Sequence, residues 1–455
     1  MMKFNALTVL GVVMMPLSAA DGQPQETVEV SQDLNAAFAS ALSAVQKSQS
    51  EDLYSLAEVV LQSGGTEADF YRLMKQMGEA GNPVAQKWLA QFILQSVTGG
   101  LHDLVTAPEA SRARELMKAS ADAGYLPALV EMARFVGSGV GAPASETEGM
   151  KYLMKASASG SGRARAAYLL LTGRLENGKF DAPEVESELK KNNFHLEEVI
   201  ASLYGDSPEA VAWLEKASAH GSPTAPFLLG QNKVDSDEAA SLALLQLSAE
   251  RHLPESLATL GVLQLNGEES ESGLRNLQLA FMLGYTPAAT TLAAQYLNRP
   301  DIYSAEHVFN IYHLGAELHD DRSSVAHAYC LVTGRGCTPS PEQGIATLRE
   351  LAYAGSPYAN IALADLYFNG CGVEPDMMKA INYLGEADAA GVPNAYVLMA
   401  VLTQLGNAAA KPDARRAELY LKMAEERGEI GARSIFDALV AEKSWHFLPP
   451  AQNKP

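Results

Sequence analysis

The densest group of side chains that could do chemistry lies near residues 310–327 of this 455-residue chain. Its members are imidazoles and carboxylates, namely His313, Glu317, His319, Asp320, Asp321 and His327. Such donors suit zinc or a similar metal, and His313 and Glu317 are one helical turn apart. His313 and His319 are six residues apart, however, which places them on different faces of a helix. Because polar residues are also usual at a turn between helices, the pattern favours a solvated turn over a metal site.

Ser187 and Lys190 have the spacing of the Ser-x-x-Lys nucleophile motif found in penicillin-recognising enzymes. The companion Ser-Asp-Asn and Lys-Thr-Gly elements are absent from the sequence, and a four-residue pattern often arises by chance. The glycine-rich segment 137–143 follows an expected helix and lacks the Lys-Ser/Thr of a phosphate loop. We therefore expect no catalytic residues, no metal and no cofactor, and a hydrolase using Ser187 is a minor alternative.

The elements that carry these residues recur along the chain at a period of roughly 31–38 residues. The clearest copy spans residues 354–391, and a second spans 123–160. Both patterns predict a helix, a glycine-rich loop, a second helix and a glycine stop. A unit this small cannot bury its own apolar face, so it must stack on neighbouring units. The sequence therefore predicts an all-α solenoid of about 9–11 stacked antiparallel helix pairs.

Glycine and proline mark the unit boundaries. A glycine, which adopts the left-handed conformation without steric cost, follows the second helix at Gly81, Gly124, Gly160, Gly221, Gly284, Gly355, Gly391 and Gly428. Two of these intervals are long enough for two units, so a glycine stop is missing near His252 and near Asp320 and Asp321. Prolines that suit the first turn of the next helix follow at Pro83, Pro127, Pro223, Pro254, Pro287, Pro357 and Pro393.

The unit resembles a Sel1-like repeat, a relative of the tetratricopeptide repeat with a longer loop between its helices. The residues that fill the family pattern in the best copy are Gly355, Ala359, Leu363, Ala364, Tyr367, Gly370, Gly372, Val373, Asp376, Lys379, Ala380, Tyr383, Leu384, Ala387 and Gly391. The resemblance covers most of residues 66–435, although the copies within 207–320 lack the Gly-x-Gly-Val loop. It implies a right-handed superhelix of paired helices and a role in protein–protein interaction, and it carries no family catalytic residues.

The N-terminus has the pattern of a secretory signal peptide. Lys3 supplies the positive region, residues 6–15 supply a short apolar region, and small residues precede a cleavage site near Ala20. An amphipathic N-terminal helix is the alternative. No later stretch is long and apolar enough to span a bilayer. We therefore expect an exported chain, and since the family is mostly bacterial, the resemblance implies a periplasmic or extracellular location.

The formal net charge is −20. Such a surface repels nucleic acid and anionic lipid at long range, and the largest basic clusters are the pairs Lys190-Lys191 and Arg415-Arg416. We therefore expect no nucleic-acid partner and no membrane span.

The chain has three cysteines, Cys330, Cys337 and Cys371. Cys337 and Cys371 occupy the same loop position one repeat apart, so stacking could bring them together in an oxidising compartment. Cys337 and Cys371 are therefore a candidate disulfide. A bridge between Cys330 and Cys337, or none at all, remains open.

The sequence divides into a signal peptide at 1–20, a flexible segment with a helix at 21–50, the repeat solenoid at 51–435 and a tail at 436–455. An irregular insertion near 174–207 suggests one or two additional helices, or one elongated repeat. The tail starts as a helix. Three residues near its end either pack on the final repeat or form a docking peptide, and they are Trp445, His446 and Phe447.

A solenoid offers a groove lined by the first helices of successive units. The candidate exposed positions in that groove lie between the apolar anchors, and they are Asn360, Asp365, Glu131, Arg134 and Gln295. The predicted function is that of an exported, non-catalytic repeat scaffold that binds another protein or a peptide in the cell envelope. One alternative is a factor that binds or assembles cell wall or polysaccharide. The other is the penicillin-interacting hydrolase.

Overall fold

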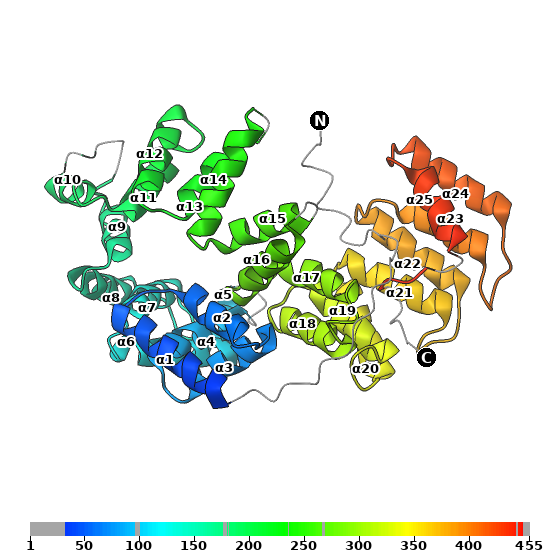
Figure 1. Ribbon diagram of the computed structural model, residues 1–455, viewed down its shortest axis with the longest axis horizontal. Helices are drawn as coiled ribbons and strands as arrows, with labels where there is room; N and C mark the ends of the chain where they lie inside the picture. The colour runs from blue at the N-terminus through cyan, green and yellow to red at the C-terminus, as the bar shows by residue number, and fades with distance from the viewer. Residues whose placement is uncertain are drawn as a thin grey trace. The chain divides into compact units, whose positions relative to one another are not determined.

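The structure is a computed structural model that describes residues 32–95, 101–175, 180, 182–234, 236–265, 269–442 and 445–448. The predicted signal peptide at 1–20 and most of the segment expected to be flexible lie outside the described residues. The described residues form 25 α-helices and no β-strand (Figure 1). Within each of the two compact units described below, most consecutive helices pack against one another. The predicted all-α solenoid is therefore confirmed.

Contacts divide the chain into two compact units, of which the N-terminal unit covers residues 27–288. Its helices are α1 (Gln32–Ser48), α2 (Leu53–Gln62), α3 (Glu67–Glu79), α4 (Pro83–Gln95), α5 (Leu101–Thr106), α6 (Pro108–Asp122), α7 (Leu126–Ser138), α8 (Glu146–Ala158), α9 (Gly162–Leu171), α10 (Pro183–Leu189), α11 (Phe194–Tyr204), α12 (Pro208–Ala219), α13 (Thr224–Gln231), α14 (Glu238–Glu250), α15 (Pro254–Leu265) and α16 (Ser270–Met282). Helices α10 and α11 lie in the segment 174–207 that looked irregular in the sequence.

The C-terminal unit begins at Ala289. Its helices are α17 (Ala288–Leu297), α18 (Ala305–Glu317), α19 (Asp321–Thr333), α20 (Pro341–Tyr353), α21 (Pro357–Asn369), α22 (Met377–Ala389), α23 (Ala395–Leu405), α24 (Ala414–Glu426) and α25 (Ala432–Ala441). The first and second helices of one repeat are, for example, α21 and α22, and the first helix of the next repeat is α23.

The predicted glycine stops are present in the backbone. All eight glycines that were expected to follow a second helix have positive φ angles, from 78° at Gly428 to 101° at Gly221. Four of the expected prolines, Pro83, Pro127, Pro254 and Pro357, stand in the first turn of a helix. The local signals that define the repeat in the sequence therefore define its boundaries in the fold.

Histidine takes the place of glycine at the two boundaries where the stop is missing. His252 has a φ of 64° and follows α14, while His319 has a φ of 56° and follows α18. Histidine is among the few side chains that tolerate this region of backbone space. The repeat period is therefore preserved where its usual residue is lost.

The N-terminal unit also makes a contact between elements far apart in sequence. Helix α16 packs against α2 and α3, and the fully buried Tyr71 of α3 donates a hydrogen bond from its hydroxyl to the Phe281 carbonyl oxygen, 2.8 Å away. Nearby, Arg275 of α16 donates to the Glu58 carboxylate of α2. Repeats normally contact only their neighbours, so this contact ties the beginning of the N-terminal unit to its end.

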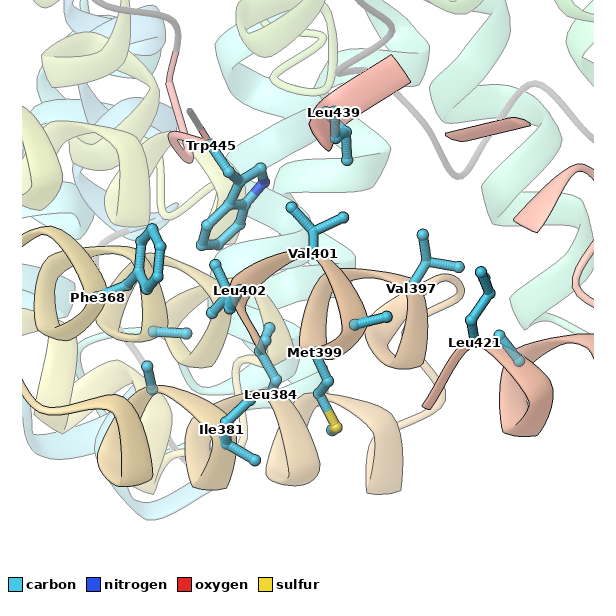
Figure 2. Close-up of a cluster of buried hydrophobic side chains, with 14 of the residues drawn as sticks. Phe368, Ile381, Leu384, Val397, Met399, Val401, Leu402, Leu421, Leu439 and Trp445 are labelled. Atoms are coloured by element: carbon cyan, nitrogen blue, oxygen red, sulfur yellow. The ribbon is translucent and has the colours of Figure 1, made fainter. Parts of the chain in front are cut away.

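The core of the C-terminal unit joins several repeats and the tail. A cluster of buried side chains from α21, α22, α23, α24 and α25 includes Phe368, Leu384, Leu402 and Trp445 (Figure 2). Small residues allow the helices to approach, and the alanines of the best repeat are completely buried, namely Ala359, Ala362, Ala364, Ala380 and Ala387. Trp445 is thus part of this core although it lies beyond the last helix.

Candidate functional site

Three consecutive first helices of the C-terminal unit carry a row of equivalent positions. Tyr329 of α19, Asp365 of α21 and Val401 of α23 each stand five residues before the glycine that ends their helix. Successive members are therefore 36 residues apart. Because equivalent positions of stacked repeats lie side by side, this row crosses three repeats.

Asp365 is at the centre of the row and has no exposed surface. Its carboxylate accepts a hydrogen bond from the Tyr329 hydroxyl and another from the amide of Asn369, one helical turn further along α21. Burial, together with the neighbouring carboxylate and its hydrogen bond, raises the pKa of Tyr329 above its ordinary value. The phenol is thus held as a hydrogen-bond donor to a buried acid.

The chain's own tail lies on this row. The Trp445 carbonyl accepts a hydrogen bond of 3.1 Å from the Asn369 amide. The His446 Nδ1 atom is 3.7 Å from a carboxylate oxygen of Asp365. The Phe447 ring packs on the Tyr329 ring, with their centroids 5.4 Å apart.

The Trp445 side chain is buried to 6% exposure and belongs to the core cluster in Figure 2. We call Tyr329, Asp365, Asn369, Val401 and Leu402, with the side chains around them, the tail-binding surface. The tail was expected either to pack on the final repeat or to serve as a docking peptide. Trp445 packs with the final helices, as the first of these expectations has it, and the tail extends beyond them to α21 and α19, the first helices of the two preceding repeats.

Two predicted positions of the C-terminal unit, Asn360 and Asp365, were expected to be exposed. Both are buried, at 8% and 0% exposure, so the expected exposure is wrong. At Asp365 the cause is visible, because Tyr329 of the preceding repeat covers the carboxylate and His446 of the tail approaches it. The repeat period predicted the position of Asp365 on its helix, but it could not predict which neighbouring side chains cover the carboxylate.

Glu131 of α7, in the N-terminal unit, was also expected to be exposed but is buried. Its carboxylate accepts a hydrogen bond of 2.8 Å from Arg134 and lies 3.1 Å from Arg163 of α9. Burial alone would raise the pKa of Glu131. The hydrogen bond and charge of Arg134, aided by Arg163 and Lys87, outweigh burial and hold the pKa below its ordinary value. Glu131 thus links repeats as one centre of an ion-pair network.

The last two predicted positions differ in exposure. Arg134 is exposed beyond its contact with Glu131, as expected. Gln295 of α17 is half-buried. Whether any of the five positions binds a ligand stays a prediction.

The histidine and carboxylate group near residue 320 has structural roles. Asp320 caps α19 by accepting a 2.8 Å hydrogen bond from the Ser323 backbone, and Asp321 accepts one of 2.8 Å from the Ser356 hydroxyl. The rings of His313 and His327 lie 5.1 Å apart. Burial, reinforced by the neighbouring histidine, lowers the pKa of His327 to about 4. Within the described part of the chain, no three histidine, cysteine or acidic side chains are placed to hold a metal ion.

Ser187 lies on the short helix α10 and Lys190 is the residue that follows its last turn, and both side chains are exposed. The Lys190 ammonium lies 3.3 Å from the Glu186 carboxylate on the same helix. That contact is an ordinary i, i+4 ion pair of a solvated helix face.

The three cysteines are free thiols in the structure. Cys330 is buried, which raises its pKa to about 12, and the Cys337 sulfur lies 3.5 Å from the Cys330 carbonyl oxygen. Burial also raises the pKa values of Cys337 and Cys371. The pairing of Cys337 with Cys371 remains a prediction.

Sequence reasoning named Asp365 but missed its partners Tyr329 and Asn369. One signal was available, because Tyr329 and Val401 stand 36 residues on either side of Asp365. No repeat period could indicate the tail, which lies outside the array. No helix in the described ranges is sufficiently long and apolar to cross a membrane.

The Sel1 repeat family model matches five segments, at residues 126–161, 202–222, 324–356, 357–390 and 393–429. Together they make up less than half of the chain. The last three segments are contiguous or nearly so, and they contain most of α19 and all of α20 to α24. The tail-binding surface therefore lies within matched Sel1 repeats.

A curated relative, an uncharacterized protein of Neisseria meningitidis serogroup B, is 27% identical over 196 residues. The match covers 41% of this chain and 41% of that protein, so this chain aligns with less than half of it. A solved Sel1 repeat protein from Oxalobacter formigenes is 22% identical, with a TM-score of 0.41, over 50% of this chain and 99% of its own. A protective antigen of uropathogenic Escherichia coli with an SLR fold is 15% identical, with a TM-score of 0.42, and the match covers 91% of this chain and 99% of that protein.

Proposed function

We propose that this chain, five segments of which match the Sel1 repeat model, is a non-catalytic scaffold that binds other proteins through the faces of its first helices. The observation that carries the proposal is the tail. Residues 445–448 lie outside helices, and they pack with α23 in the buried cluster and contact α21 and α19, the first helices of three successive repeats. A surface that holds one segment of protein by backbone and aromatic contacts has the chemistry to hold another.

We further propose that the scaffold works in the cell envelope. The support is the N-terminal pattern of Lys3, an apolar stretch and small residues before Ala20. Edman sequencing or mass spectrometry of protein isolated from the envelope should find a mature N-terminus near Asp21. An intact N-terminus in protein from the cytoplasm would contradict export while leaving the scaffold function open.

Photo-crosslinking in intact cells tests the scaffold function directly. A photoreactive amino acid at Thr333, exposed at the end of α19, would stand beside the tail-binding surface, one repeat before Asn369. The same amino acid at Tyr353, which is 97% exposed at the end of α20, provides the control in the same repeat.

We expect one reproducible protein adduct from Thr333 and none of that size from Tyr353. The scaffold proposal would be refuted by a lack of protein adducts at Thr333 and at equivalent positions of the other first helices. Retention of the chain on sedimented cell-wall material in that case would favour a glycan-binding protein.

A further inference from the structure

We propose that the tail-binding surface recognises a segment of a partner protein in which two aromatic residues flank a basic one, and that residues 445–447 occupy the site until such a segment displaces them. The inference rests on the scaffold function and names the chemistry of its partner. It starts from the order of contacts. Trp445 packs in the core with α21 and α23, His446 approaches α21, and Phe447 packs on α19.

The two aromatic side chains of the tail provide the anchoring contacts. The Trp445 ring fills a site among Phe368, Leu402 and neighbouring side chains (Figure 2), and the Phe447 ring packs on Tyr329 at a 55° angle. Buried aromatic residues commonly carry most of the energy of an interface, and tilted or edge-on aromatic pairs are favourable beyond the area that they bury. An aromatic residue at each of these two places is therefore the first requirement for a ligand.

The central position selects for positive charge. Asp365 is completely buried in the folded chain, and Tyr329, Asn369 and the tail surround its carboxylate. A second carboxylate beside it would be repelled at short range, whereas a cation would be attracted. His446 stops at 3.7 Å from the carboxylate, which exceeds a normal hydrogen bond. A longer lysine or arginine side chain could close that distance, so the chain's own tail is not the best ligand for the site.

The backbone contact does not depend on sequence. Asn369 donates its amide to the Trp445 carbonyl oxygen, a bond that any residue at that place could accept. The site thus combines a general backbone anchor with side-chain selection at three successive residues. That combination allows a different segment to take the same position as the tail.

Attachment to the same chain makes the tail a strong competitor even with a modest fit. Only two residues separate Glu442, which follows α25, from Trp445. Short tethers give effective concentrations on the order of millimolar. A free peptide that binds the vacant site with a dissociation constant of about 10 μM would therefore bind the intact chain on the order of 100-fold more weakly.

The test uses the full chain with its tail disabled. The double variant Trp445→Ala/Phe447→Ala vacates the surface without shortening the protein. Binding of a fluorescent peptide with the tail sequence Ser-Trp-His-Phe-Leu-Pro-Pro is measured by anisotropy. The peptide is also made with arginine or with aspartate in place of histidine. We expect the double variant to bind the tail peptide at least about tenfold more tightly than the wild type, the arginine peptide to bind best and the aspartate peptide worst.

Tyr353→Ala is the matched control because it removes an exposed aromatic residue elsewhere in the unit, and it should bind the peptides as the wild type does. If thermal melting shows that the double variant does not fold, His446→Asp replaces it. That change places a second carboxylate beside Asp365 and should also release the tail.

The inference is overturned if the folded variants bind the tail peptide no better than the wild type does, or if the arginine and aspartate peptides bind equally well. In that case, a partner protein crosslinked at Thr333 would still support the scaffold function. If the variants do not bind the tail peptide better and no partner is crosslinked, both the scaffold function and this inference are refuted.

Discussion

The same glycine-to-alanine change should have opposite effects in two consecutive repeats of the C-terminal unit. Gly344 lies in α20 where that helix crosses α19. A Cβ atom at Gly344 would stand 2.5 Å from the Ala328 carbonyl oxygen and 2.6 Å from a methyl group of Val332. Gly385 lies in α22, and a Cβ atom there would have no heavy atom within 4 Å.

The magnitudes follow from two opposing effects. Alanine in a helix interior is favoured over glycine by roughly 0.5–1 kcal/mol. Gly385→Ala should therefore raise the free energy of unfolding by about that amount. At Gly344 the same gain is opposed by a clash with backbone, and such overpacking costs roughly 1–3 kcal/mol. Gly344→Ala should therefore lower the free energy of unfolding by about 0.5–2 kcal/mol.

Urea unfolding followed by circular dichroism measures the sign of each change. Repeat arrays can unfold in parts, so hydrogen exchange of α19 to α22 should accompany the global measurement. Exchange in these helices should slow in Gly385→Ala and quicken in Gly344→Ala. If the free energy of unfolding changes in the same direction in both variants, the close approach of α20 to α19 is not as described, and the reasoning about repeat packing fails.

Three further predictions test single contacts. Tyr71→Phe removes the hydroxyl that donates a hydrogen bond to the Phe281 carbonyl oxygen and should lower the free energy of unfolding by about 1 kcal/mol. Backbone hydrogen exchange should quicken in α3 and α16 together. Faster exchange in α3 alone would refute the coupling of the two helices. Burial lowers the pKa of His327 from 6.5 to about 4, so the unfolded chain binds its proton more readily. Stability should therefore fall as the pH drops from about 6.5 toward 4, and His327→Gln should show a smaller loss of melting temperature between about pH 7.5 and pH 5. If Cys337 and Cys371 form a disulfide, denatured, unreduced protein will have one reactive thiol, and three reactive thiols would exclude the bridge.

Much of the fold can be predicted from glycine and proline residues that mark helix ends and helix starts in the sequence. Glycine stops such as Gly355 and proline starts such as Pro357 act within one turn of a helix, so their positions translate directly into boundaries. Even the gaps in the pattern were informative, since His252 and His319 stand where the period requires a left-handed residue. A repeat fold is thus predictable because its units fold by neighbouring contacts.

The contacts that escaped prediction join residues far apart in sequence. Tyr71 bonds to a carbonyl 210 residues away, and the tail reaches back to a tyrosine more than a hundred residues before it. No period describes such contacts, because each occurs once. The burial of Asp365 belongs to the same class, since part of what surrounds it is the tail.

A strictly regular array would place similar side chains at Tyr329, Asp365 and Val401, since all three occupy one position of the repeat. Here one is a phenol, one a carboxylate and one an aliphatic side chain. A buried carboxylate is costly unless it is satisfied by hydrogen bonds or charge, so stacking alone would favour an apolar residue at Asp365. The irregularity coincides with the place where the tail supplies a histidine between two aromatic residues. Because stacking alone does not require a carboxylate at Asp365, this departure from the repeat pattern is the feature on which the proposed recognition of a partner segment rests.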